Sequence, residues 1–101
     1  MLEGWNAGPR LHNLVHVWVG GDMSPGTSPN DPVFFLNHCN VDRIWEAWMA
    51  DNNREYLPAA GQGPVGHQVD DFMVAILGER MRPEDVLDPS EWYAYDTLTV
   101  D

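Results

Sequence analysis

Two segments of the chain repeat apolar residues with the 3.6-residue period of an α-helix. The first begins near Pro9, which suits the first turn of a helix, and stops at Gly20-Gly21. Its apolar positions follow the spacing i, i+3, i+4, i+7 and i+8, and they are Leu11, Leu14, Val15, Trp18 and Val19. The pattern predicts an amphipathic helix over residues 9–19 with this stripe turned to a buried side.

The second helical segment begins at Asp31-Pro32, where Asp31 suits the N-cap and Pro32 the first helical position. We expect this helix to run to about Asp51. Its inner stripe recurs at spacings of 4, 3, 4 and 3, and consists of Phe34, His38, Val41, Trp45 and Trp48. A histidine therefore occupies a position where the pattern predicts an apolar core residue.

The remaining sequence is richer in loops. Residues 20–32 and 58–66 are rich in Gly, Ser and Pro and predict loops. Helical spacing predicts a short helix over 69–77, and one further helical turn is expected over 83–87. Residues 92–100 predict a short strand or an extended segment. The fold class is mainly α.

Composition narrows the function classes. The 101 residues suit one small domain, and 16 acidic against five basic residues give a formal net charge of −11. Such a surface repels nucleic acid and anionic membranes. The single cysteine, Cys39, excludes an internal disulfide framework, and we expect a buried, inert thiol. The sequence shows no signal peptide and no apolar run approaching about 18 residues. We therefore expect a soluble chain and assign it to no particular compartment.

Three histidines fall at inward-facing helical positions. His12 and His16, four residues apart, share one face of the first helix, and His38 would join them from the second. Three imidazoles without a carboxylate form a neutral ligand set that suits copper cycling between two oxidation states. The structural alternative is a chance His-x-x-x-His pair and a satisfied core histidine. The fourth, His67, lies in a predicted loop, where we expect it to be exposed and not a ligand.

Each ligating imidazole normally has a second partner that fixes its tautomer. Asp42, one turn after His38, is a candidate acceptor for that ring, and the alternative is that it pairs with a nearby arginine.

Residues 11–21 and 28–45 closely resemble the second copper-binding region of tyrosinases, above all the bacterial ones. The core pattern is Asp-Pro-x-Phe, three residues, then His-x-x-x-Asp, matched by Asp31, Pro32, Phe34, His38 and Asp42. Residues 85–88 and the Tyr-x-Tyr motif at 93–95 resemble the end of the tyrosinase catalytic domain. Two departures are Asn37, where many relatives have a histidine, and residues 72–82, which match poorly.

The resemblance implies that residues 1–101 are the C-terminal, second-copper half of a type 3 copper four-helix-bundle domain, with a loop-rich C-terminal part. It implies one copper ion on His12, His16 and His38, and two in the assembled site. The implied reaction is ortho-hydroxylation of monophenols and oxidation of catechols to ortho-quinones by dioxygen, as in melanin biosynthesis.

The resemblance also assigns Asn13 and Glu3 to a water that deprotonates the incoming phenol. Asn13 directly follows the first ligand, and Glu3 stands nine residues before that ligand. For Glu3 the alternative is a solvated acidic residue near a terminus. By the same analogy, Pro25 and Gly26 lie near the pocket mouth and leave it open.

One copper region needs a second. Four histidines cannot supply six ligands, so we expect a partner chain or a separate N-terminal half, and little or no activity from this chain alone. Two alternatives remain open: a haemocyanin-like oxygen carrier, disfavoured by Asn13 and the bacterial-like loop lengths, and a non-catalytic half-domain or interaction module.

Overall fold

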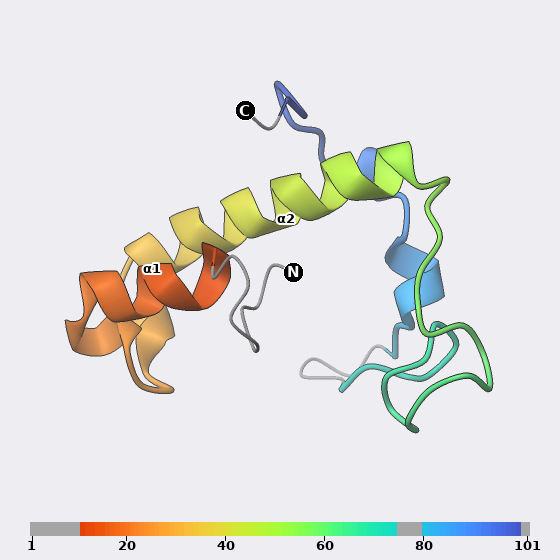
Figure 1. Cartoon of the computed structure of the whole chain (residues 1–101), viewed down its shortest axis with the longest axis horizontal. Helices are drawn as coiled ribbons and strands as arrows, with labels where there is room; N and C mark the ends of the chain where they lie inside the picture. The colour runs from red at the N-terminus through yellow and green to blue at the C-terminus, as the bar shows by residue number, and fades with distance from the viewer. Residues whose placement is uncertain (1–10, 75–79, 100–101) are drawn as a thin grey trace. The chain divides into compact units, whose positions relative to one another are not determined.

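The computed structural model describes residues 11–74 and 80–99 of the chain (Figure 1). Within these residues no strand occurs, and the predicted mainly α class is confirmed. The elements in chain order are α1 (Leu11–Val19), η1 (Gly21–Met23), η2 (Ser28–Asn30), α2 (Val33–Asp51), η3 (Pro83–Val86) and η4 (Pro89–Glu91), where η denotes a 3-10 helix. Neither α-helix in the described ranges combines the length and apolar character needed to cross a bilayer.

The chain divides into two compact units. The first runs to Ala47 and also takes in the residues from Leu98, and it holds α1, η1, η2 and most of α2. The second covers Trp48–Thr97 and is mainly loops and 3-10 turns.

Helix α1 ends at a glycine turn that directs the chain into η1. Gly20 has a φ of 70°, in the left-handed region that favours glycine, and its N–H donates to the carbonyl of His16 at 3.1 Å. The N–H of Met23 in turn donates to the carbonyl of Gly20 at 3.0 Å. The turn therefore brings the main chain of Met23 back to the last turn of α1, where its carbonyl contacts His16.

Asp31 caps the start of α2 as predicted. Its carboxylate accepts a hydrogen bond from the N–H of Val33 at 2.9 Å, which satisfies one of the donors left unpaired at a helix start. The helix ends at Asp51, also as predicted, where Asn53 and Arg54 adopt positive φ values of 55° and 54°. The N–H of Arg54 closes the end by donating to the carbonyl of Met49 at 2.8 Å.

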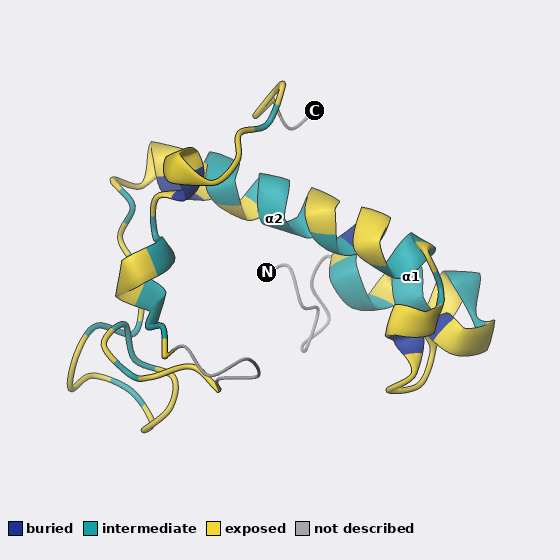
Figure 2. Cartoon of the chain, turned by 180° about the vertical axis from the view of Figure 1, so that it is seen from behind, coloured by how far each residue is buried: buried dark blue, intermediate teal, exposed yellow. Residues whose placement is uncertain are grey.

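The predicted burial of the α1 stripe is wrong for its largest members. Trp18 is 82% exposed and Leu14 58%, whereas His12, Val15 and His16 are half-buried (Figure 2). The covered side of α1 is therefore centred on the histidines, which meet a histidine of α2, and the bulky apolar side faces outwards. In the described residues the fully buried large side chains are Met23 and Met49.

The predicted helix at 69–77 is wrong over its described part, because residues 69–74 form a turn followed by irregular backbone. The carboxylate of Asp71 accepts from the N–H groups of Gln68 and Gly66, at 2.9 and 2.7 Å, and these bonds hold the pKa of Asp71 below its ordinary value. Val69 donates its N–H to the carbonyl of Pro58 at 3.1 Å. These local bonds compete with a helix for the same groups.

The later segments follow the expectation more closely. The helical turn predicted over 83–87 is present as η3, and residues 93–99 are irregular or extended, without strand pairing. In the first unit, Arg43 of α2 donates through Nη1 to the carbonyl of Thr99 at 2.8 Å and through Nε and Nη2 to Oδ1 of Asn40 at 3.2 and 3.1 Å. The end of the described chain is thereby fastened to α2.

The cap at Asp31 yields a stability prediction. Asp31→Ala removes the acceptor for the N–H of Val33 and should lower the free energy of unfolding by about 1 kcal/mol, measured by denaturant titration followed by circular dichroism. Asp51→Ala is the matched control, because removing a negative charge at the C-terminal end of α2 is neutral or slightly stabilising. Equal losses in the two variants would contradict the capping role.

Candidate metal centre

The structure brings together the three histidines that the sequence singles out. The Nε2 atom of His12 lies 2.9 Å from Nε2 of His38 and 3.1 Å from Nε2 of His16. The three rings meet edge to face, with centroids 4.6–5.3 Å apart. Helix α1 contributes two of them four residues apart, and α2 contributes the third, so three ring nitrogens converge on one point.

The opposite nitrogen of each ring is held by an oxygen. Nδ1 of His16 donates to the carbonyl of Met23 at 2.7 Å, and Nδ1 of His38 donates to the carbonyl of Phe34 at 2.7 Å. Nδ1 of His12 lies 2.8 Å from Oδ1 of Asn13. Because a carbonyl oxygen cannot donate, Nδ1 must carry the proton, which leaves the lone pair of Nε2 directed at the common point.

This arrangement has the features of a metal-binding site. Nitrogen ligands lie about 2.0 Å from a bound first-row metal, so neighbouring nitrogens in one coordination sphere stand roughly 3 Å apart, close to the spacing observed. The three candidate ligand atoms all lie within 4.8 Å of one another, and the three histidines are half-buried. Neutral imidazoles held by second partners suit copper or zinc.

Three contacts of the site were not predicted from the sequence. The ring of Phe34 lies over the ring of His38, with centroids 3.9 Å apart and planes tilted by 31°. The acceptor for Nδ1 of His38 is the main-chain carbonyl of Phe34, so the first of the two roles considered for Asp42, as acceptor for that ring, is wrong. The four-residue spacing of Phe34 and His38 could have indicated the stacking. The Met23 carbonyl could not have been found, because a loop carbonyl leaves no mark in the sequence.

The two residues adjacent to His38 in the sequence differ in burial, and one of them differs from the expectation. Cys39 is exposed, and the expectation of a buried thiol is wrong. Asn37 is buried, 9% exposed, and its Nδ2 donor has no hydrogen-bond partner.

The remaining candidate positions are one histidine, two loop residues and one residue outside the described chain. His67 is exposed in a loop, as expected. Pro25 and Gly26 are exposed, and a Cβ added at Gly26 would meet no atom within 4 Å. Glu3 lies outside the described residues.

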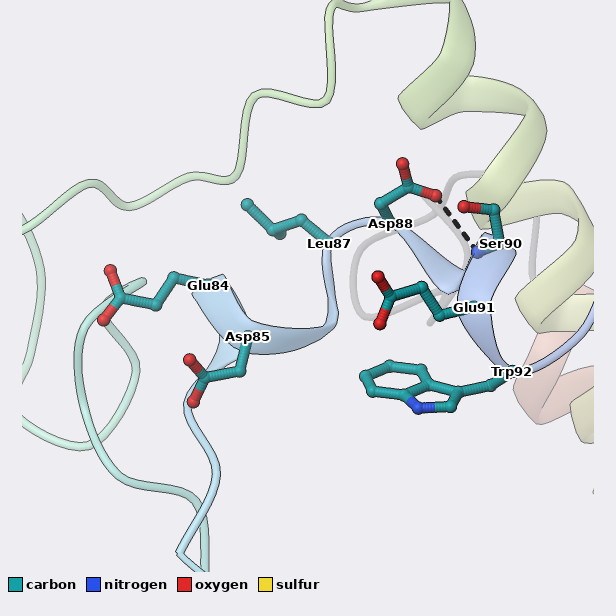
Figure 3. A pocket seen from close by; sticks show the side chains of 7 residues that line it. All are labelled: Glu84, Asp85, Leu87, Asp88, Ser90, Glu91 and Trp92. Atoms are coloured by element: carbon teal, nitrogen blue, oxygen red, sulfur yellow. Dashed lines mark hydrogen bonds between the residues drawn. The ribbon is translucent and has the colours of Figure 1, made fainter.

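A pocket in the second unit offers different chemistry. Its volume is about 290 Å³, and it is lined by Glu84, Asp85, Leu87, Asp88, Ser90, Glu91 and Trp92 (Figure 3). Four of these seven residues are carboxylates. Hydrogen bonds from Ser90 hold the pKa of Asp88 below its ordinary value, so this carboxylate stays charged. An open, acidic pocket suits neither a soft metal nor a neutral phenol, so the histidine cluster is the candidate site.

The sequence of this chain is similar to the sequences of known proteins. Residues 1–51 match the family described as the common central domain of tyrosinase. The chain is 48% identical to a tyrosinase of Streptomyces glaucescens and 46% identical to one of Streptomyces lincolnensis, each over 95% of this chain and 34% of the relative. A grixazone synthase of Streptomyces griseus is 42% identical over 86% of this chain and 28% of its own length. The chain thus spans about a third of the length of the curated relatives it matches.

The convergence of the three Nε2 atoms predicts one transition-metal ion per chain. His38→Ala removes the ligand from α2 and should abolish stoichiometric binding, measured by metal analysis after dialysis against Cu²⁺. His67→Ala is the control and should keep the full metal content, because His67 is exposed in a loop. An unchanged metal content in the His38 variant would refute the ligand assignment.

Proposed function

Because the chain belongs to the tyrosinase family, we propose that it supplies the second of the two copper sites of a phenol oxidase, with His12, His16 and His38 as ligands. The convergence of their three Nε2 atoms is the observation that carries this proposal. Residues 1–101 then correspond to the C-terminal half of the copper-binding domain.

The proposed reaction converts a monophenol and dioxygen into an ortho-quinone and water, and the same site oxidises catechols. His12, His16 and His38 would hold a copper ion, which would supply one-electron redox chemistry towards dioxygen. Activating dioxygen for insertion into a phenol takes two electrons, so a second copper site has to stand close by. The contribution of this chain is to fix three ligand nitrogens and leave one side open for substrate.

A complementary half is the partner that the structure supports. Leu11 and Trp18 of α1 are 49% and 82% exposed, and Trp45 and Trp48 of α2 are 36% and 43% exposed. Exposed apolar area on this scale is typical of a surface that packs against another part of the folded protein.

The side chain of Asn13 has two roles in the proposed enzyme. Its Oδ1 holds Nδ1 of His12, which leaves its amide NH₂ group as the part that can hold a water. We propose that this water, with Glu3 as the second holder, takes the proton of the incoming phenol.

A non-catalytic half-domain is the second candidate, favoured by the exposed apolar faces and by the single three-histidine cluster in the described residues.

The two candidates are separated by complementation. We expect the copper-loaded chain alone to oxidise a catechol no faster than free copper. Co-expression with the part of the Streptomyces glaucescens tyrosinase that this chain does not match should restore catechol oxidation under oxygen, because the second copper is then present.

The control for that experiment is the His38→Ala chain co-expressed with the same partner, which should stay inactive. Robust turnover by the isolated monomeric chain would refute the half-site proposal. A complex that forms, binds copper and stays inactive would favour the non-catalytic module.

A second prediction concerns Asn13 in the complemented enzyme. Asn13→Leu should depress monophenol hydroxylation more than catechol oxidation, because only the monophenol must lose its proton before oxygen is inserted. Loss of a positioned base costs ~10²–10⁴-fold. The ratio of the two rates is the measurement, because loss of copper affects both equally.

Asn30→Leu, an exposed residue in η2, is the control and should leave the ratio unchanged. Equal losses on a monophenol and a catechol in the Asn13 variant would count against the water-holding role.

A further inference from the structure

Phe34 contacts two of the three imidazoles in the cluster. It lies one helical turn before His38 on α2, and its ring stacks on that imidazole with centroids 3.9 Å apart. It also meets the ring of His16 of α1 edge to face, with centroids 6.1 Å apart and planes at 75°. One aromatic ring therefore supports ligands from both helices.

The same residue holds His38 at a second atom. The main-chain carbonyl of Phe34 accepts the hydrogen bond from Nδ1 of His38 at 2.7 Å. The carbonyl fixes the tautomer, whereas the stacked ring limits rotation of the imidazole about its Cβ–Cγ bond. Because substitution at Phe34 removes the ring and keeps the carbonyl, the two effects can be separated by mutation.

We propose that Phe34 is a positioning residue that fixes the orientation of His38 before the metal binds and thereby sets the affinity and coordination geometry of the site. The inference rests on the proposed metal-binding function. A ligand already held in its bound orientation loses little conformational freedom on binding. Substitution of residues that support metal ligands in this way typically weakens metal binding about 10–100-fold.

The test compares four forms of the full chain: wild type, Phe34→Leu, Phe34→Tyr and Phe35→Leu. Tyrosine keeps the stacked ring. Phe35 is the matched control, because it adjoins Phe34, is 63% exposed, and its ring meets Phe34 (centroids 5.3 Å apart) and not an imidazole in the described structure. The measurements are Cu⁺ affinity by competition with a chromogenic chelator and the Cu²⁺ electron paramagnetic resonance spectrum.

We expect Phe34→Leu to bind copper about tenfold more weakly, with an altered copper hyperfine coupling. Phe34→Tyr and Phe35→Leu should keep the wild-type spectrum and an affinity within about twofold. Wild-type affinity and spectrum in Phe34→Leu, or an equal loss in Phe35→Leu, would overturn the inference. Failure of the wild-type chain itself to bind copper would overturn the metal site rather than the role of Phe34.

A second measurement needs no variant and no metal. Protons of an imidazole stacked under a benzene ring shift upfield, so the ring protons of His38 should resonate upfield of those of the exposed His67 in the nuclear magnetic resonance spectrum of the metal-free chain. Coincident shifts for the two histidines would show that the stack is absent and would overturn the inference even if Phe34→Leu failed to fold.

Discussion

The site depends on the position of one proton on each of three imidazole rings. A metal takes the lone pair of Nε2 only when the proton sits on Nδ1, and here each Nδ1 faces an oxygen at 2.7–2.8 Å. Two of those oxygens are main-chain carbonyls, of Met23 and Phe34. The ligand set is thus prepared largely by the path of the backbone, and side-chain substitutions near the site leave those two acceptors in place.

The path of the backbone depends on a few residues whose conformations are restricted. The left-handed turn at Gly20 ends α1 and carries the chain back, so that the Met23 carbonyl reaches His16. The cap at Asp31 starts α2 at the register that puts Phe34 and His38 one turn apart on its inner side. A residue inserted between Asp31 and His38 would turn this ligand by about 100° round α2 and remove it from the cluster.

Much of the helical fold and of the histidine cluster could be predicted from the sequence. Both helix ends, the cap at Asp31 and the meeting of the three histidines follow from local rules of spacing and capping. Burial could not be predicted in the same way: the apolar period of α1 correctly indicated a helix, but Leu14 and Trp18 face solvent because the histidine side meets α2.

Two further sequence-based predictions, the helix over 69–77 and the acceptor for His38, are wrong for the same reason. At 69–74 the apolar spacing suggested a helix, and a turn formed instead, in which the carboxylate of Asp71 accepts hydrogen bonds from the N–H groups of Gly66 and Gln68. At His38 an acidic side chain one turn away suggested the acceptor, and the acceptor of Nδ1 is a main-chain carbonyl of the preceding turn. Both depend on main-chain groups, which sequence patterns do not display.

The central claim is that three imidazoles of one chain, bound through Nε2, hold a single copper ion. X-ray absorption spectroscopy of the chain loaded with one equivalent of copper tests it most directly. The account predicts three imidazole nitrogens at about 2.0 Å, with the outer-shell scattering of intact rings. A sulfur scatterer in the first shell, as from Cys39 or a methionine, or fewer than three imidazoles, would contradict it.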